Sequence, residues 1–204
     1  MAIIVDGVAI DLPGVSSLSW HDDPALRLHF PLMGVARRQL EVQAIVLHTT
    51  RGARSDIVLD GEAPAEACTG RRTIRIWQRG DRHAGAHLVV DADGTVLCLG
   101  DLAAEVAYHC VGINGTSVGV AVVQQPSGAI YRRQVDVVVA LVRLLTERLH
   151  VPRRVAWPYR GARSGMELVR GVFGHRDAIN NRGAGDPGDI LMGTIAALPG
   201  WVQF

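Results

Sequence analysis

The chain has 204 residues, of which 48% are hydrophobic and 20% are charged, and its formal net charge is +1. These values are typical of one globular domain with a full core. A charge so close to zero gives no reason to expect nucleic acid or an anionic membrane as a partner. No apolar run approaches the ~18 residues of a membrane span, and the first residues lack the basic segment of a secretory signal. We therefore expect synthesis in the cytoplasm, with delivery by other means to any substrate outside.

Residues 1–40 are expected to form an extension that packs against the domain formed by residues 41–204. Two short apolar segments flank Asp6 and Gly7, a dipeptide typical of tight β-turns, so they predict a hairpin at residues 3–10. The remainder of the extension shows no pattern of an independent domain.

The first half of the main domain is rich in predicted strands. Residues 43–48 form a continuous apolar run, which predicts a strand buried on both faces. Residues 51–72 indicate a loop with one short helix near residues 64–67, and residues 73–77 alternate in a way that fits a strand or a helix. Residues 87–99 predict a β-hairpin around an Asp-Gly turn.

The second half predicts an α/β arrangement. A buried strand is expected at residues 117–123, where Gly119 indicates close approach of another backbone. Residues 131–150 carry apolar side chains at helical spacing and end before Pro152, which predicts an amphipathic helix. An irregular loop, a strand at 169–173 and a helix at 188–199 follow. This order predicts a single α/β domain with a central mixed sheet flanked by helices.

Two imidazoles and one carboxylate stand out as candidate metal ligands. His48 ends the first buried strand, and His175 and Asp186 lie on a glycine-rich segment further along the chain. On its own, His48 would be read as a hydrogen-bonded histidine at a strand end. Three such ligands suit zinc and leave a fourth position for water. The cysteines form no CxxC pair, so no cysteine zinc site is expected.

Several segments resemble, in the same order, the zinc-dependent N-acetylmuramoyl-L-alanine amidases of the type-2 amidase and peptidoglycan-recognition-protein superfamily, which includes phage-T7-type lysozyme. The resemblance covers residues from about 43 to 198. It is carried by residues 45–50 (IVLHTT), 86–96 (AHLVVDADGTV), 107–110 (AYHC), 114–120 (NGTSVGV), 174–177 (GHRD) and 186–188 (DPG). It implies that His48, His175 and Asp186 bind Zn²⁺, and that the amide between N-acetylmuramic acid and L-alanine is cut.

The chain departs from the family pattern at three positions. Ala121 stands where many catalytic members have a glutamate base, Ala86 where others have a tyrosine, and Ala184 where a lysine occurs. Arg182 is a candidate to stabilise the oxyanion, although arginine stays protonated and is no base. His109 is the remaining candidate for proton transfer or oxyanion binding, and the alternative is that it shapes the groove wall.

Five further residues are candidate substrate contacts, namely Thr49, His87, Asn114, Trp157 and Tyr159. For His87 the alternative is a hydrogen-bonded histidine in the core or wall. For Trp157 and Tyr159, stacking on a sugar competes with ordinary packing of their loop onto the domain.

Three functions follow from the resemblance. The first is a zinc amidase that cuts peptidoglycan, as an antibacterial endolysin or delivered effector on the cell wall, or as a recycling enzyme acting on muropeptides in the cytoplasm. The second is a domain that retains zinc and binds peptidoglycan with little or no cleavage, which the three alanines favour. The third is a zinc hydrolase for another amide, with a groove rebuilt by residues 157–171. The intact ligand set favours the enzyme, and the sequence predicts no oligomeric state.

Overall fold

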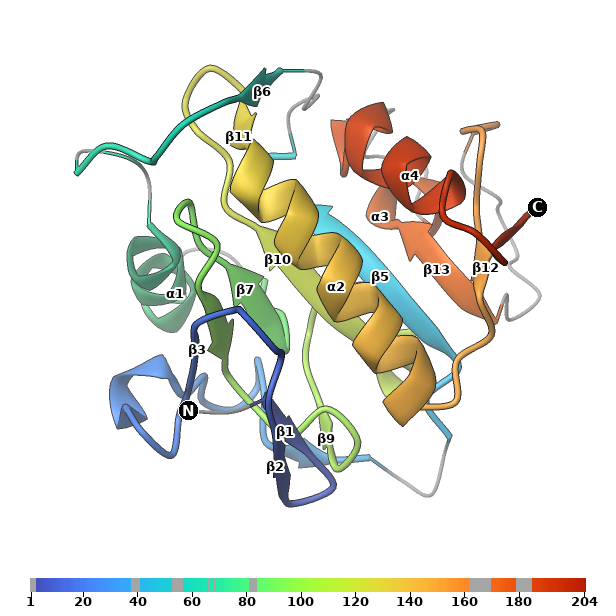
Figure 1. The fold of residues 1–204 in the computed structure, drawn as a ribbon. Helices are drawn as coiled ribbons and strands as arrows, with labels where there is room; N and C mark the ends of the chain where they lie inside the picture. Colours follow the sequence, from blue (N-terminus) through green and yellow to red (C-terminus); the bar gives the residue numbers. More distant parts are fainter. Residues whose placement is uncertain are drawn as a thin grey trace.

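The structure is a computed structural model, and it describes residues 3–37, 41–52, 57–65, 67, 69–80, 84–161, 170–178 and 185–204. A mixed sheet of eight strands forms its centre, in the order β14-β12-β13-β5-β10-β7-β8-β3 (Figure 1). The strands of this sheet are β3 (Ser17–Ser19), β5 (Ala44–Thr49), β7 (Leu88–Val90), β8 (Val96–Cys98), β10 (Ser117–Val122), β12 (Arg154–Val155), β13 (Gly171–Gly174) and β14 (Val202–Gln203). Its described pairs are parallel except for the antiparallel hairpin β7–β8. The predicted central mixed sheet is therefore confirmed.

Helices pack on both faces of this sheet. Helices α2 (Arg132–Arg148) and α4 (Asp189–Ala196) cross one face (Figure 1), whereas α1 (Gly70–Gln78) packs on the other. The short elements η1 (Pro24–Leu26) and η2 (Asn114–Thr116) connect strands, and α3 (His175–Ala178) lies between β13 and α4. No helix in the described part of the chain is long and apolar enough to cross a membrane.

Alternation along β5 separates the two faces of the sheet. Ile45 and Leu47 join the core beneath α2 and α4, whereas Ala44 and Val46 join a cluster on the opposite face. Because side chains alternate along a strand, His48 belongs to the face opposite α2. The site is therefore built on the side that also carries α1.

The N-terminal extension belongs to the same structure. Strands β1 (Ile3–Val5) and β2 (Val8–Ile10) form the predicted hairpin, and β3 adds an edge strand to the central sheet by pairing with β8. Strand β4 (Val35–Ala36) pairs with β9 (Glu105–Val106). Leu26, Leu28, Leu32 and Met33 fill a buried cluster together with Ile74 and Trp77 of α1.

Several local predictions can be compared with these elements. The strand at 43–48, the hairpin at 87–99 and the helix at 131–150 are confirmed. The ambiguous residues 73–77 lie in α1, which Thr69 caps by accepting a hydrogen bond from the Arg72 amide. The described residues near 64–67 form a turn and not a helix, and strands β6 (Val58–Leu59) and β11 (Ile130–Tyr131) pair nearby.

Candidate metal centre

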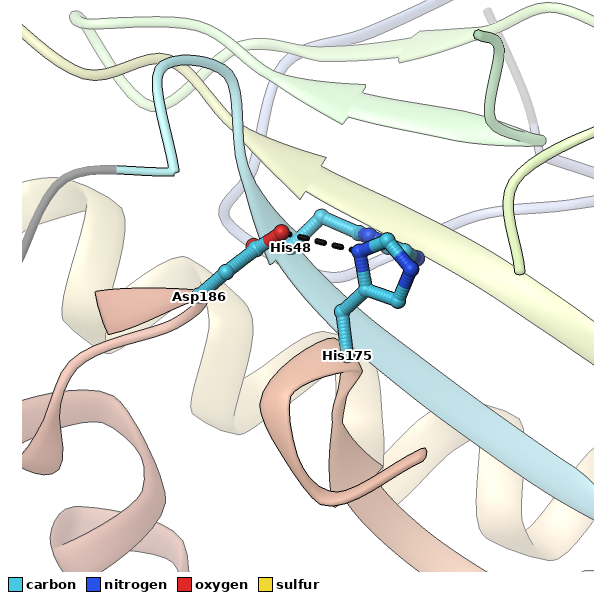
Figure 2. Close-up of side chains that lie close together, drawn as sticks. All are labelled: His48, His175 and Asp186. Atoms are coloured by element: carbon cyan, nitrogen blue, oxygen red, sulfur yellow. Dashed lines mark hydrogen bonds and ion pairs between the residues drawn. The ribbon is translucent and has the colours of Figure 1, made fainter. Parts of the chain in front are cut away.

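The three predicted ligands meet where two parallel strands end. His48 lies in β5, and His175 begins α3 directly after β13, whose Gly174 pairs with Leu47. Asp186 lies shortly before α4. One donor atom from each of His48, His175 and Asp186 lies within 4.8 Å of the others, and the side chains point toward one another (Figure 2).

Short hydrogen bonds hold this cluster. Nδ1 of His175 lies 2.9 Å from Oδ2 of Asp186, and the amide of Thr49 donates to Oδ1 of Asp186 at 2.8 Å. The amide of Arg176 donates to the Asp186 carbonyl at 2.7 Å, which ties α3 to the segment before α4. The adjacency of strands, rather than sequence proximity, therefore brings the ligands together.

The cluster fits a metal ion on two observations. His48, His175 and Asp186 are only 8%, 3% and 2% exposed. Nε2 of His175 is buried and has no hydrogen-bond partner among the described residues. Buried polar atoms without a partner are costly and call for a ligand or ion. Imidazole nitrogens with a carboxylate oxygen form a donor set that suits zinc.

His109 lines the same cavity and lies in hydrogen-bond contact with the ring of His48. Its Nδ1 lies 3.2 Å from Nε2 of His48, and its Nε2 lies 3.2 Å from Oγ of Ser117. Ser117 donates its hydroxyl proton to the Ile113 carbonyl, so Nε2 of His109 is the donor to Oγ. Nδ1 of His109 then carries the lone pair and accepts a proton from Nε2 of His48. This arrangement places the ring proton of His48 on Nε2 and fixes the orientation of the ring.

Burial keeps His109 neutral. Desolvation, reinforced by His87, holds the pKa of His109 well below its usual value, although the contact with Ser117 opposes this. The ring packs against β10, where a Cβ on Gly119 would lie 2.5 Å from Cγ of His109. The close approach predicted at Gly119 is therefore real, but the neighbour is an imidazole ring and not another backbone.

His87 is placed in the wall and not in the cavity. Its side chain is 0% exposed, its Nδ1 accepts the Gly119 amide at 3.0 Å, and its Nε2 lies 3.1 Å from the Glu105 carbonyl. Desolvation, aided by the nearby charge of Arg37, lowers the pKa of His87 to about 3. With both nitrogens engaged, the alternative reading of a hydrogen-bonded wall histidine fits His87 better than a substrate contact.

A cavity of about 380 Å³ opens over the ligands. It is lined by His48, Thr49, Thr50, Arg51, Gly52, Trp77, Ala84, Gly85, His109, Ala121, His175 and Asp186. A second cavity of about 300 Å³ along α1 shares Thr50, Arg51 and Trp77 with the first. The two cavities therefore adjoin and form one cleft along α1.

Of the other predicted substrate contacts that the structure describes, only Thr49 lines the cavity over the candidate ligands. Thr49 lines the cavity, and its buried Oγ1 has no hydrogen-bond partner among the described residues. Asn114 accepts hydrogen bonds from the amides of His109 and Cys110 with its side-chain oxygen, so it holds the loop and does not line the cavity.

The two predicted aromatic contacts pack on the domain. Trp157 packs near Gly193 of α4, and Tyr159 lies over the Arg176 guanidinium. For these two aromatic residues the contacts match the packing alternative. Arg182 lies outside the described residues.

Comparison with known proteins identifies the family of the chain. The model of Amidase_2, N-acetylmuramoyl-L-alanine amidase, matches residues 38–189. This match spans most of the chain. The chain belongs to this amidase family. A comparison with the sequences of curated proteins finds no match.

Solved structures of type-2 amidases and peptidoglycan recognition proteins share the fold. N-acetylmuramoyl-L-alanine amidase LysC from Clostridium intestinale URNW is 16% identical, with 91% of this chain and 96% of that chain covered and a TM-score of 0.53. A mutant of Drosophila PGRP-LB in complex with tracheal cytotoxin is 14% identical, with 91% and 96% covered and a TM-score of 0.54. Apis mellifera PGRP-SA is also 14% identical, with 92% and 98% covered and a TM-score of 0.54. At these identities the likeness establishes the fold.

Within this amidase domain, the departures from the family pattern can be located. Ala121 pairs with His48 in the register of β10 and β5 and lines the cavity. Ala86 is fully buried, and Ala184 lies outside the described residues. In the described lining, Asp186 is the only carboxylate.

Six residues of the cavity lining were not proposed as site residues from the sequence, namely Thr50, Arg51, Gly52, Trp77, Ala84 and Gly85. Trp77 is fixed by α1, whose helical nature the alternating pattern left open. Gly85 is held at the cavity because its amide donates a hydrogen bond to the Tyr108 carbonyl at 2.8 Å. Arg51 could have been suspected because it follows His48 by three residues.

Proposed function

We propose that this amidase domain is a zinc-dependent N-acetylmuramoyl-L-alanine amidase that hydrolyses the amide between N-acetylmuramic acid and L-alanine in peptidoglycan or muropeptides. The observation that carries the proposal is the buried cluster of His48, His175 and Asp186 beneath an open cavity. Zinc held there would supply a water of lowered pKa and would polarise the scissile carbonyl. The family match supports the choice of amide bond.

The protein's own groups have separate tasks in this proposal. Asp186 is fixed by the Thr49 amide, so its carboxylate meets His175 in a set orientation. His109 holds the ring of His48 and fixes which nitrogen carries the proton.

The cleft supports a substrate with an extended chain. The cavity over the ligands continues past Thr50 and Arg51 toward Arg72 on α1. No ion pair of the Arg72 side chain occurs within the described part of the chain, so this cation is available to an acidic group. A peptide that leaves the scissile bond along α1 would present its carboxylates to Arg72.

A second candidate function is a recognition domain that keeps zinc and binds peptidoglycan while cutting slowly or not at all. The observation that favours it is Ala121, whose methyl group lies beside His48 where a glutamate would supply a base. A general base typically contributes about 10²–10⁴-fold to the rate. Under this alternative the same cleft and metal serve binding.

The test measures metal and product together. The protein is purified without chelator, its zinc content is determined, and it is incubated with purified peptidoglycan. Mass spectrometry then looks for released peptides that begin with L-alanine. We expect zinc in the wild type and peptide release, and loss of both in His175→Ala, because a ligand is removed. The exposed histidine variant His29→Ala should match the wild type.

Other outcomes separate the candidates. Zinc at one ion per chain with binding to peptidoglycan but no released peptide would select the recognition domain. Absence of zinc in the wild type would contradict both candidates.

A further inference from the structure

We propose that Arg37, in the N-terminal extension, is a positioning residue for the metal centre, because it ties together the two loops that hold His109 against His48. The inference rests on the proposed function only for the identity of the metal. Residue 37 lies outside the span of 38–189 that matches the family model, so the match assigns it no role.

The guanidinium of Arg37 spans two loops that are far apart in sequence. On the first loop, Nε donates to the carbonyl of Ala103 at 3.1 Å, and Nη2 donates to those of Leu102 at 3.2 Å and Glu105 at 2.9 Å. On the second loop, Nη1 donates to the carbonyl of Gly115 at 2.7 Å, and Nη2 donates to that of Ser117 at 3.1 Å. The backbone amide of Arg37 adds a bond of 2.7 Å to the Ala104 carbonyl.

This arrangement requires the shape of arginine as well as its charge. All of these acceptors are neutral backbone carbonyls. Desolvation lowers the pKa of Arg37 to about 10, yet the side chain remains protonated at neutral pH. Only a planar fork of five N–H donors reaches both loops at once, whereas the compact ammonium of lysine does not.

The second loop carries the groups that orient His109. Asn114 accepts the His109 amide at 2.9 Å, and Oγ of Ser117 receives the His109 ring proton. Arg37 binds the backbone of both Ser117 and the residue next to Asn114. Any movement of this loop would therefore reach His109, and through it the ring of His48.

The first loop reaches the same histidine from the other side. It continues from Glu105 to Tyr108, the residue before His109, and the Tyr108 amide donates to the carbonyl of Leu32 in the extension at 2.8 Å. Strand β4, which precedes Arg37, pairs with β9 in this loop. Both supports of His109 are thus anchored to residues 32–37 of the extension.

The test uses two readouts on folded protein. Zinc affinity is measured by competition with a chromophoric chelator, and the imidazole ¹⁵N signals are recorded by NMR on the metal-free protein. We expect Arg37→Ala to weaken zinc binding by about 10- to 100-fold, the usual effect of losing support behind a ligand. We also expect the ring signals of His109 to move toward those of a histidine that exchanges between tautomers.

Two further variants make the test specific. Arg133→Ala removes another bond between the extension and the domain, to the Gly14 carbonyl, far along the chain from His109. It should leave zinc affinity and ring signals unchanged, even if the protein unfolds at a lower temperature. Arg37→Lys keeps the charge without the fork, and its affinity should fall between those of the wild type and Arg37→Ala.

The outcomes decide separately on this inference and on the proposed function. Folded Arg37→Ala with wild-type zinc affinity and unchanged His109 signals would overturn the positioning role. If Arg37→Ala does not fold, wild-type values for Arg37→Lys would overturn it. If the wild type binds no zinc, the proposed function fails, and the ring signals of the metal-free variants alone decide the role of Arg37.

Discussion

At the scale of single residues, Ala121 bears most directly on how well the centre can catalyse hydrolysis. Strand pairing places it beside His48, and its side chain faces the cavity. The described lining offers no carboxylate beyond Asp186, which is a candidate metal ligand and is also bonded to His175 and Thr49. A base at position 121 would therefore add a function that the described cavity lacks.

We predict that Ala121→Glu raises the rate of amide cleavage, because a carboxylate at this position can accept a proton from a water in the cavity. The expected gain is about tenfold or more, with the ~10²–10⁴ of a well-placed general base as its upper range. Ala121→Gln is the matched control, since it has the same size without a basic group. Equal rates for the two variants, with zinc content retained, would contradict the prediction.

The cluster of candidate ligands could be predicted from the sequence, whereas the groups that support it could not. His48, His175 and Asp186 each stand in a recognisable segment at the end of a strand or loop. Their burial and mutual distances follow from the pairing of β5 with β13. In contrast, Arg37 lies in a short polar stretch, and its partners are backbone carbonyls. Because every residue type has a backbone carbonyl, the sequence does not indicate which residues Arg37 binds.

At the scale of elements, helix α1 forms one side of the extended cleft. Its sequence alternates over too few residues to distinguish a strand from a helix, and the capping by Thr69 together with the burial of Ile74 and Trp77 favours the helix. Strands β3, β12 and β14 were not predicted, because two or three residues are too short to show a period.

We predict that Arg72→Ala weakens substrate binding while leaving the chemical step intact. Arg72 lines the cavity along α1, away from the ligands, so its loss should raise KM several-fold, within about 1 kcal/mol for an exposed ion pair, and leave kcat nearly unchanged. Arg75→Ala is the control, since Arg75 lies on the same helix but lines a different cavity. The measurement is steady-state hydrolysis of a soluble muropeptide. An equal effect of both variants, or a loss confined to kcat, would count against the cleft along α1.

At the scale of the whole molecule, the extension and the domain share one fold. Leu26, Leu28, Leu32 and Met33 complete the cluster on the face that carries the site, and β3 closes one edge of the sheet. The hairpin at residues 3–10 could be predicted from its Asp-Gly turn. The edge strand and the burial of the four apolar residues depend on partners about 50 to 80 residues away, so no local pattern shows them.

Buried neutral histidines should make the folded protein sensitive to acid. The pKa of His87 falls from its usual value near 6.5 in the unfolded chain to about 3 in the folded protein, because burial disfavours its charged form. The unfolded state therefore binds more protons between these values. Stability is fully present above pH ~6.5 and decreases as the pH falls toward ~3, by up to about 1.4 kcal/mol per pH unit for this residue.

Urea unfolding of metal-free protein between pH 7.5 and 4.5 tests this expectation. His87→Gln can reproduce both hydrogen bonds without a titratable group, so its free energy of unfolding should depend less steeply on pH than that of the wild type. His29→Gln, at an exposed position, should keep the wild-type slope. Identical slopes for all three proteins would show that His87 does not titrate between the two states.

The central claim is that the cluster of His48, His175 and Asp186 holds the zinc ion on which amide cleavage depends. The most direct measurement is to strip the protein of metal, add back zinc in fractions of an equivalent, and follow the release of L-alanine-terminated peptides from peptidoglycan. The account predicts that release rises in proportion to added zinc and stops rising at one ion per chain. Release that is complete without zinc, or no release at one bound zinc per chain, would contradict it.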